Sequence, residues 1–473
     1  MNMAHNRRTF IAGGAATGAS VLALSPLLAT IGASSAATAA TGGFDFDTPY
    51  NRIGTGCVKW DGAIAAEHMS HIVAGMGIAD MDFKCAPAIM AALRKRMEHE
   101  NWGYNSIDID LILGTGANNP FVKGIIDWNA KRYGINVITP KNLGVTTGVH
   151  SGIMATLRAY APEGSKVLMT TPIYNGFYFD LYSGRLQANE SLMKFVNGRY
   201  EIDFDDVDKR MSDPATKTMI LCNPHNPTGR CWTKAELTRL GEMALKHKVV
   251  VLSDEIHCDF VSKGQKYVPF STLDDKAVVA NSITFKSGSK SFSLAGMKCA
   301  WFVTTNPEMY KKVAFYNHAD LSTLGQIAEE AAYAGGESWL NQCVNYIDGN
   351  QQFANDYIKS KIPLIKVGNK PESTYLAWLD VSPLMAKIGA QKMADEANKH
   401  PTGTNFMTGK PAMTTPSEMV SHWVAKNASV QISAGSSFGK GGENYMRMNL
   451  ATNRKTLTAA LDSIAAACKT LGA

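Results

Sequence analysis

Hydrophobic and polar positions alternate between two periodicities from about residue 120 onward. The spacing over Ile125–Tyr133 predicts a helix, and Thr233 with Glu236 predicts a capping box that opens a second helix ending near His247. Three short apolar runs predict buried strands: Lys166–Thr171, Lys217–Cys222 and Val249–Ser253. Strand–helix–strand repetition of this kind predicts an α/β fold in which a mostly parallel sheet is flanked by helices on both faces.

The last third of the chain carries a second, α+β pattern, with strands predicted at Thr374–Asp380 and Tyr445–Leu450. Residues 398–417 are rich in proline, glycine and threonine, and we expect a long loop there. The predicted organisation has four parts, which are a signal peptide (1–39), an N-terminal segment of a small domain (40–92), a large ligand-binding domain (93–340) and the C-terminal small domain (341–473).

The first 39 residues differ from the rest of the chain in charge and composition. Arg7 and Arg8 are their only charged side chains, and an uncharged run rich in Gly, Ala, Ser and Leu extends to Asp45. Adjacent arginines before an apolar run are typical of a twin-arginine signal peptide, and Ala37 and Ala39 fit its cleavage site. We therefore expect the twin-arginine export machinery to carry the folded protein to the bacterial periplasm.

A retained membrane anchor is the alternative interpretation of this segment, because the uncharged run is long enough to span a bilayer. Its many small and hydroxyl-bearing residues, together with Pro26, make the run only weakly apolar. We therefore expect the segment to be removed, which would leave no stable membrane anchor.

Composition and charge exclude several classes of protein. The chain has 473 residues, of which 45% are hydrophobic and 19% charged, so it is neither disordered nor collagen-like. The net charge of +6 includes the two export-segment arginines, and no basic block suggests a nucleic-acid partner. The 8 cysteines form no C-x-x-C pair. Disulfide bonds can form in an exported protein, but a chain of this length folds without them, so we expect the cysteines to be free, buried thiols. We also expect no metal site.

Two residues that follow predicted strands suggest cofactor chemistry. Lys290 lies among small residues after an apolar run, a setting in which a lysine forms a Schiff base with an aldehyde cofactor. A solvated loop lysine is the plain alternative. Asp254 ends a buried strand and needs a cationic partner to stay ionised, and a pyridinium nitrogen would serve. A helix N-cap or a structural ion pair explains Asp254 equally well by itself.

Two loops complete the pattern. Asn226 lies in a turn made rigid by two Asn-Pro steps and a glycine, which directs its amide toward the strand ends. The segment Gly148–His150 precedes an apparent helix and offers backbone N–H groups to an anion such as phosphate. Each segment alone is a weak signal, whereas their order along the chain is informative.

In this order and spacing the four segments resemble the fold-type I pyridoxal 5′-phosphate (PLP) enzymes of the class I/II aminotransferase group, and more closely the MalY/PatB-type C–S β-lyases. The resemblance covers roughly residues 44–470 and rests on these matches: Arg52–Asp61, Ala79–Ile89, Leu221–Trp232, Leu252–Val261, Ser289–Met297, Thr374–Asp380 and Gly435–Gly439. It implies the PLP-dependent transferase fold (type I), with 93–340 as the PLP-binding domain and an amino acid as the substrate.

The resemblance also implies a role for each matching residue. Lys290 would bind the PLP aldehyde and then take the Cα proton, while Asp254 would pair with the pyridine nitrogen. Asn226 would hydrogen-bond the ring hydroxyl, and Tyr174 would stack on the ring. The phosphate would be held by the backbone amides of Gly148, Val149 and His150, by Ser287 and by Lys298.

Two further matches concern the substrate and a second subunit. Arg447 matches an arginine that binds the substrate α-carboxylate, for which a guanidinium fork is suited. Without the resemblance, an exposed strand arginine in a surface ion pair is the better interpretation. Tyr104 matches a tyrosine that reaches the phosphate from a partner subunit, so a homodimer is implied.

The chain departs from the wider group at three places. Lys298 stands where arginine is usual, so the phosphate would meet a point charge. His257 stands where many aminotransferases carry a tyrosine at the ring hydroxyl, which matches the β-lyase branch and makes His257 a predicted cofactor-binding residue. The loop at 398–417 resembles an insertion relative to typical β-lyases, and it bears on the substrate entrance.

The motifs leave more than one reaction open. We favour a C–S β-lyase acting on cystathionine or cysteine S-conjugates, because the matches at 221–232 and 252–261 look closest to that branch. Transamination is the alternative, and racemisation remains open.

Two hypotheses come from other classes of protein. Ser287 and Lys290 fit the S-x-x-K pattern of penicillin-binding and β-lactamase serine enzymes, but the companion motifs are missing and we expect Ser287 not to open a helix. An exported binding protein that keeps the fold without turnover is disfavoured by the presence of both Lys290 and Asp254.

Overall fold

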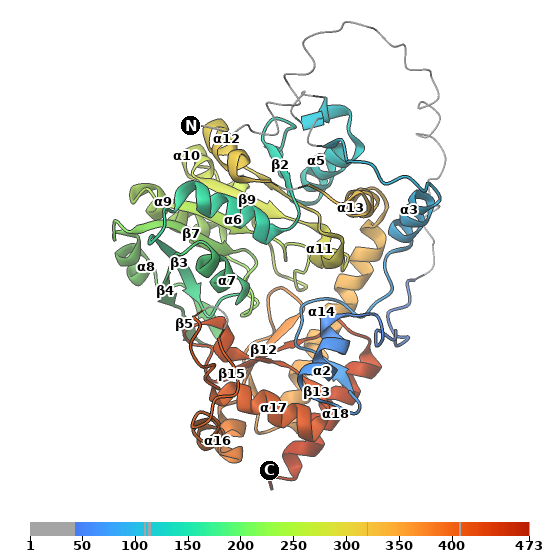
Figure 1. Ribbon diagram of the computed structural model, residues 1–473, viewed down its shortest axis with the longest axis vertical. Coiled ribbons are helices and arrows are strands. Elements are labelled where there is room, and N and C mark those ends of the chain that lie inside the picture. The colour runs from blue at the N-terminus through green and yellow to red at the C-terminus, as the bar shows by residue number, and fades with distance from the viewer. Residues whose placement is uncertain (1–42, 108–109, 112–114, 319, 406–407, 473) are drawn as a thin grey trace, which may run out of the picture. The chain divides into compact units, whose positions relative to one another are not determined.

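The three predicted strands lie side by side in a seven-stranded sheet of the computed structural model (Figure 1). The order of its strands is β2 (Leu143–Thr146), β10 (Ala300–Val303), β9 (Ser282–Lys286), β8 (Val250–Asp254), β7 (Thr216–Cys222), β3 (Lys166–Thr171) and β4 (Gln187–Leu192). β10 is antiparallel to both of its neighbours, and the other pairs are parallel. The prediction of a mostly parallel sheet is confirmed.

The structure describes residues 43–472 apart from 108–109, 112–114, 319 and 406–407. The predicted export signal, with Arg7, Arg8, Ala37 and Ala39, lies outside the described residues. From Gly43 onward the chain forms one compact unit, and the predicted division into a large and a small domain stays a prediction.

Helices cover both faces of the large sheet because successive strand residues point to opposite sides. In β7, Ile220 packs against one face with α6 (Val149–Tyr160), α7 (Gly176–Ser183) and α12 (Pro307–Tyr316). Its neighbour Leu221 packs against the other face with α8 (Phe204–Met211), α9 (Lys234–Lys246) and α10 (Lys276–Ala280). Each such side chain contributes about 2 kcal/mol of stability on burial. Because both faces of these strands are buried, their sequences are continuously apolar.

Local signals determine where the predicted helices begin. α9 opens on the predicted capping box, since Thr233 accepts a hydrogen bond from the backbone N–H of Glu236 and the Glu236 carboxylate accepts one from the Thr233 N–H. The helix predicted over residues 125–133 is α5 (Pro120–Tyr133), which begins earlier because the Asn119 side chain caps it ahead of Pro120. An N-cap of this kind is worth about 1 kcal/mol.

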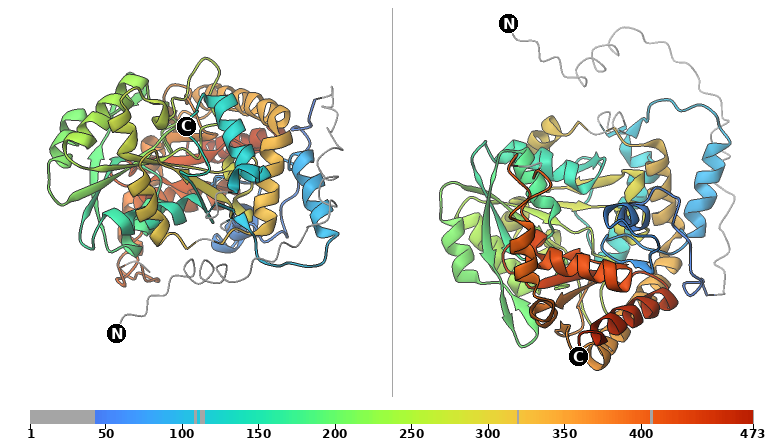
Figure 2. Two further views of the ribbon diagram at one scale, coloured as in Figure 1. Left: turned by 90° about the horizontal axis from the view of Figure 1, so that it is seen from above. Right: turned by 60° about the horizontal axis from the view of Figure 1, so that its bottom comes forward.

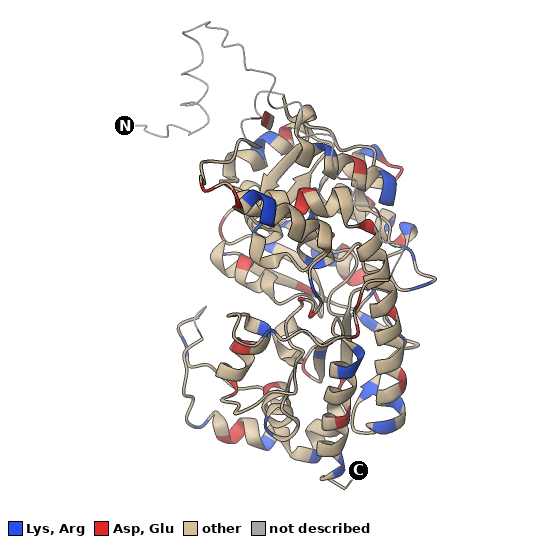
Figure 3. Cartoon of the chain, turned by 90° about the vertical axis from the view of Figure 1, so that its right-hand side faces the viewer, with Lys and Arg blue, Asp and Glu red and all other residues tan. Residues whose placement is uncertain are grey.

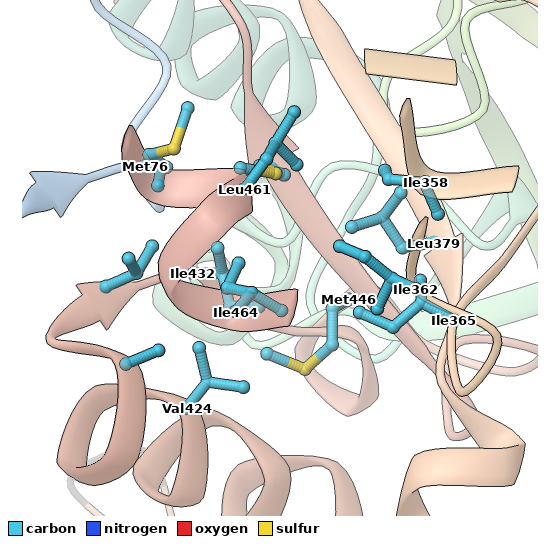
Figure 4. Close-up of a cluster of buried hydrophobic side chains, with 14 of the residues drawn as sticks. Met76, Ile358, Ile362, Ile365, Leu379, Val424, Ile432, Met446, Leu461 and Ile464 are labelled. Carbon is cyan, nitrogen blue, oxygen red and sulfur yellow. The ribbon is translucent and has the colours of Figure 1, made fainter. Parts of the chain in front are cut away.

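A second, four-stranded sheet is built from the C-terminal part of the chain, in the order β11 (Lys366–Val367), β12 (Leu376–Asp380), β15 (Tyr445–Asn449) and β14 (Ser433–Ala434). The strands predicted at 374–380 and 445–450 are thereby confirmed as β12 and β15. Helices that contribute side chains to the apolar cluster on this sheet (Figure 4) include α14 (Glu337–Lys361), α17 (Pro416–Ala428) and α18 (Arg454–Lys469). Helices α17 and α18 lie side by side (Figure 2).

The remaining helices and strands lie outside the two large sheets. They are α2 (Ala63–Ala66), α3 (Pro87–Met97), α11 (Gly288–Ser291), α13 (Thr323–Gly335), α15 (Ser382–Ile388), α16 (Ala390–Ala397), the pair β1 (Ala74–Gly75) and β13 (Val430–Gln431), and the hairpin of β5 (Lys194–Val196) and β6 (Arg199–Glu201). The predicted long loop joins α16 to α17. Asn398 ties its two ends together through paired hydrogen bonds with the Thr414 backbone, at 2.7 and 2.9 Å. That this loop is an insertion stays a prediction.

Lysine and arginine are interspersed with aspartate and glutamate over the side shown in Figure 3. Within the described residues no helix combines the length and apolarity needed to cross a bilayer, and no group of three or more His, Cys, Asp or Glu side chains is placed to hold a metal ion. All 8 cysteines are free thiols, and six of them are buried.

Candidate active site

The four motifs meet in one cavity of about 450 Å³. β7, β8 and β9 are parallel, so the segments that follow them emerge at one edge of the sheet, as expected for ligand sites in such folds. Nine of the predicted residues line the cavity: Gly148, Val149, His150, Tyr174, Asn226, Asp254, His257, Lys290 and Lys298. The structure therefore brings together most of the predicted cofactor site.

Lys290 lies in the one-turn helix α11, which follows β9. Its Nζ donates a hydrogen bond of 2.8 Å to the carbonyl oxygen of Ala79. Burial, reinforced by the nearby charge of Arg447, lowers the pKa of Lys290 to about 8. An appreciable fraction of the amine is thus neutral near pH 7, as required of a nucleophile that attacks an aldehyde.

Ser287 differs from the sequence expectation in one respect, because it does open a helix. Its Oγ caps α11 by accepting a hydrogen bond from the Ser289 backbone N–H at 2.9 Å, and Oγ donates to the Cys299 carbonyl at 2.7 Å. The helix is a single turn of small and polar residues, which is too short to show a helical pattern in the sequence. Ser287 is buried beneath the cavity, and Lys290 Nζ bonds elsewhere, so these contacts do not form the Ser–Lys pair of a serine hydrolase.

Asp254 ends β8 and is buried. Desolvation raises the pKa of its carboxyl group to about 6, although the backbone N–H of Ile256 and the nearby charges of His150 and Lys290 oppose the rise. Among the described residues no salt bridge involves Asp254, which sets aside the structural ion-pair alternative. A cation bound in the cavity would supply the missing counter-charge.

Arg447 is not the surface arginine that its strand position alone suggested. It is buried, and burial lowers the pKa of its guanidinium to about 10. Its Nη2 donates to the Gly77 carbonyl at 2.8 Å, and Nη1 to Asn226 Oδ1 at 3.3 Å. The guanidinium carbon lies 4.8 Å from the Phe438 ring centroid. No described carboxylate pairs with this buried cation, so an anionic ligand would satisfy it.

Two aromatic side chains complete the wall of the cavity. His257 is fully buried with Nδ1 unpartnered among the described atoms, and desolvation holds its pKa well below the ordinary value, so the ring is neutral. The Tyr174 ring is held by Phe177, edge to face, with centroids 5.5 Å apart. Lys298 also lines the cavity, and its backbone is in the left-handed conformation with φ 55°.

Tyr104 is a predicted site residue that the structure does not place at this cavity. Its side chain is fully exposed, and it lines a different hollow with Trp102, Asp320 and Thr323. The predicted contact is with the cofactor of another subunit, so a single chain leaves that prediction open.

Two cavity features were not predicted. The Ala79 carbonyl, which accepts from Lys290, belongs to the matched segment 79–89 but is a backbone group without a sequence signal. Asp180 lies 30 residues from His150 in sequence, and its carboxylate Oδ2 is 2.6 Å from His150 Nδ1. Asp180 sits in the apolar sequence of α7, and a lone acid there gives no indication of its partner.

Comparison with known proteins identifies a family for this chain. A family model described as aminotransferase class I and II matches residues 72–464. The chain belongs to this family. The chain is 31% identical over 431 residues to cystathionine beta-lyase PatB of Bacillus subtilis (strain 168), covering 89% of this chain and 99% of that one. It is 30% identical over 349 residues to protein MalY of Escherichia coli (strain K12), covering 72% and 85%.

Two solved structures of similar proteins share the fold of this chain. Cystalysin from Treponema denticola, which contains a PLP cofactor, superposes with a TM-score of 0.78 at 26% identity over 90% of this chain and 99% of that one. The PLP-bound C–S lyase from Staphylococcus hominis gives 0.75 at 27% identity, over 90% and 98%. The predicted PLP-dependent transferase fold (type I) is confirmed.

The groups around the cavity of this family member fit PLP. Lys290 offers an amine, Asp254 an uncompensated carboxylate, and His257 a neutral ring whose Nδ1 lacks a partner among described atoms. The N-terminus of α6, with Gly148–His150, and the Lys298 ammonium offer positive potential to a phosphate. Ser287, which is already engaged by Ser289 and Cys299, is less free for the predicted phosphate contact.

Proposed function

We propose that the protein is a PLP-dependent C–S β-lyase that converts cystathionine or a related cysteine S-conjugate, with water, into a thiol, pyruvate and ammonia. The observation that carries the proposal is that Lys290 and Asp254 line one cavity and that the unpaired cation Arg447 bonds Asn226 of its wall, in a chain of which 89% is similar to cystathionine beta-lyase PatB. The C–S lyase from Staphylococcus hominis supports the same assignment.

Each of these residues has a task in that reaction. PLP, when bound, supplies the aldehyde that takes the substrate amine and a cationic ring that withdraws electrons from Cα. Asp254 holds the ring nitrogen protonated. Arg447 binds the α-carboxylate and so orients the Cα–H bond. Lys290 would accept the Cα proton, and the thiolate sulfur would leave Cβ with the electron pair of the C–S bond.

Transamination is the second candidate, because the same residues suit it and the family model carries that name. The two reactions differ in their need for a keto acid. We expect the purified, PLP-loaded protein to release thiol and pyruvate in equal amounts from cystathionine with no keto acid present. Thiol is measured with a chromogenic disulfide and pyruvate by a coupled dehydrogenase. Turnover only after a 2-oxo acid is added would instead identify an aminotransferase.

Replacing Arg447 with lysine tests the carboxylate-binding role. The lysine ammonium keeps the charge but loses the planar fork, so KM for the amino acid should rise roughly tenfold to a hundredfold, with a smaller change in kcat, as expected for a lost charge-assisted contact. Steady-state kinetics on cystathionine give both constants. Arg454→Lys is the matched control, since Arg454 packs on Phe353 away from the cavity. An unchanged KM in the Arg447 variant would contradict this role.

Export and dimerisation belong to the proposal as separate parts. The paired arginines Arg7 and Arg8 and the uncharged run after them support twin-arginine export to the periplasm. The fully exposed Tyr104 ring, placed away from its own cavity, supports a homodimer in which it reaches the partner's phosphate site.

A further inference from the structure

One wall of the cofactor cavity carries a histidine–carboxylate pair. His150 lies in the first turn of α6, and its Nδ1 is 2.6 Å from Oδ2 of Asp180 in α7. Asp180 is buried, whereas the His150 side chain is 44% exposed and lines the cavity. The hydrogen bond to Asp180 engages Nδ1, and among the described residues no hydrogen bond engages Nε2.

The surroundings hold the imidazole ring in this orientation. Its centroid lies 5.5 Å from that of Tyr174, the side chain expected to stack on the cofactor ring. A Cβ atom at residue 176 would lie 2.6 Å from His150 Cε1 and 2.9 Å from Nε2, so Gly176 leaves the space that the ring occupies. The ring is thus packed against Gly176 and hydrogen-bonded to Asp180.

The charge of His150 follows from the groups that face it. Burial disfavours the charged ring, but the hydrogen bond and negative charge of Asp180 outweigh it, and Asp254 adds to the attraction while Lys290 opposes it. The result is a raised pKa for His150. The remaining titratable neighbour, Tyr174, is neutral at these pH values because burial raises its pKa. The protonated form of His150 is therefore favoured, at the same helix end that offers amides to an anion.

We propose that His150, held by Asp180, is a positioning residue that presents a protonated imidazole to the phosphate of the cofactor. The proposal rests on the proposed function only in requiring a PLP-type cofactor. His150 would join Lys298 and the α6 amides as a titratable cation at the phosphate site. The affinity of the protein for the phosphate should therefore fall as pH rises and His150 loses its proton. The phosphate itself is doubly ionised above about pH 6.

The test measures binding of pyridoxamine 5′-phosphate to cofactor-free protein by equilibrium dialysis between pH 6.5 and 9. This probe has no aldehyde, so Lys290 chemistry does not enter. At pH 6.5, His150→Gln should bind it roughly tenfold more weakly than wild type, the loss expected for one charge-assisted contact. The two proteins should converge at pH 9. Pyridoxamine, which lacks the phosphate, should bind both equally.

Asp180→Asn provides a second variant that leaves the imidazole in place. Without the carboxylate the pKa of His150 drops, so the wild-type loss of affinity should move to lower pH, and the His150 proton titration in NMR spectra should move with it. The matched control is Asp208→Asn, which removes the carboxylate of a similar pair on the surface, where Asp208 Oδ1 is 2.8 Å from His247 Nε2. It should behave as wild type.

The possible results separate the two proposals. The role of His150 would be overturned if His150→Gln and wild type bound the probe equally at pH 6.5, or if the variant lost affinity equally for pyridoxamine and its phosphate. The pair would then only link α6 to α7 in the fold. An unshifted profile in Asp180→Asn would overturn the role of Asp180. Because no amino acid substrate is present, a wrong reaction assignment leaves these results unaffected. Failure of wild type to bind either PLP or its amine would instead overturn the proposed function.

Discussion

Lys290→Ala protein is expected to be colourless with added PLP and to lose cystathionine cleavage by at least roughly 10⁴-fold, since general-base catalysis alone contributes up to that factor. The reason is that Lys290 offers both an amine to the cofactor and a proton acceptor near Cα. Its buried position and its pKa of about 8 suit both tasks. The loss of colour is measured by absorbance and by borohydride trapping followed by peptide mapping. The loss of cleavage is measured by pyruvate release.

Lys286→Met serves as the matched control for loss of a buried lysine. Lys286 is buried and lies four residues away, but its Nζ bonds Asn129 Oδ1 at 2.8 Å and packs over Tyr133, outside the cavity. This variant should lose thermal stability and keep its colour. Added methylamine should restore part of the activity of Lys290→Ala. Trapping of PLP on another lysine in wild type would contradict the assignment of Lys290.

Asp254→Ala is expected to lower kcat roughly a hundredfold to a thousandfold, the loss typical of removing one partner of a buried charge pair. Without the carboxylate the ring nitrogen loses its proton and withdraws fewer electrons from Cα. An N-methylated PLP analogue carries a fixed positive charge, so it should restore much of the activity of this variant. Equal turnover of the variant with both cofactors would contradict the role of Asp254.

The same carboxylate predicts a pH dependence. Desolvation raises the pKa of Asp254 to about 6 in the cofactor-free protein, so the group is negative above that pH and neutral below it. Its attraction for a cationic ring is therefore present at pH 7 and is lost as pH falls through about 6. Cofactor affinity, measured by dialysis, should decline over this range in wild type. Asp254→Asn should show a smaller decline, because only the protonation of the phosphate then remains.

Much of the fold was predictable because it depends on local patterns. The strands at 166–171 and 217–222 are continuous apolar runs, which is what burial on both faces of a parallel sheet requires. The capping box at Thr233 marks the start of α9 within the sequence itself. Ser287 was the exception, since a four-residue helix is too short to show a periodicity.

The site was predictable to the extent that its residues follow strands of one sheet. Asp254 and Lys290 end or follow neighbouring parallel strands, so their proximity follows from the order of the sheet. Arg447 was different. Its strand belongs to the second sheet, and only the packing of that sheet near the first buries the guanidinium beside Asn226.

By itself, the sequence determined the α/β class, the strands that carry the motifs, and the chemical types of the residues that would hold a PLP-like cofactor. These follow from periodicity, turn chemistry and the order of motifs, all of which act over short distances along the chain. Only the tertiary structure decided the charge states and the pairings. Burial sets the pKa of Asp254, Lys290 and Arg447, and the contact of His150 with Asp180 joins two helices. Desolvation and close contact depend on neighbours distant in sequence.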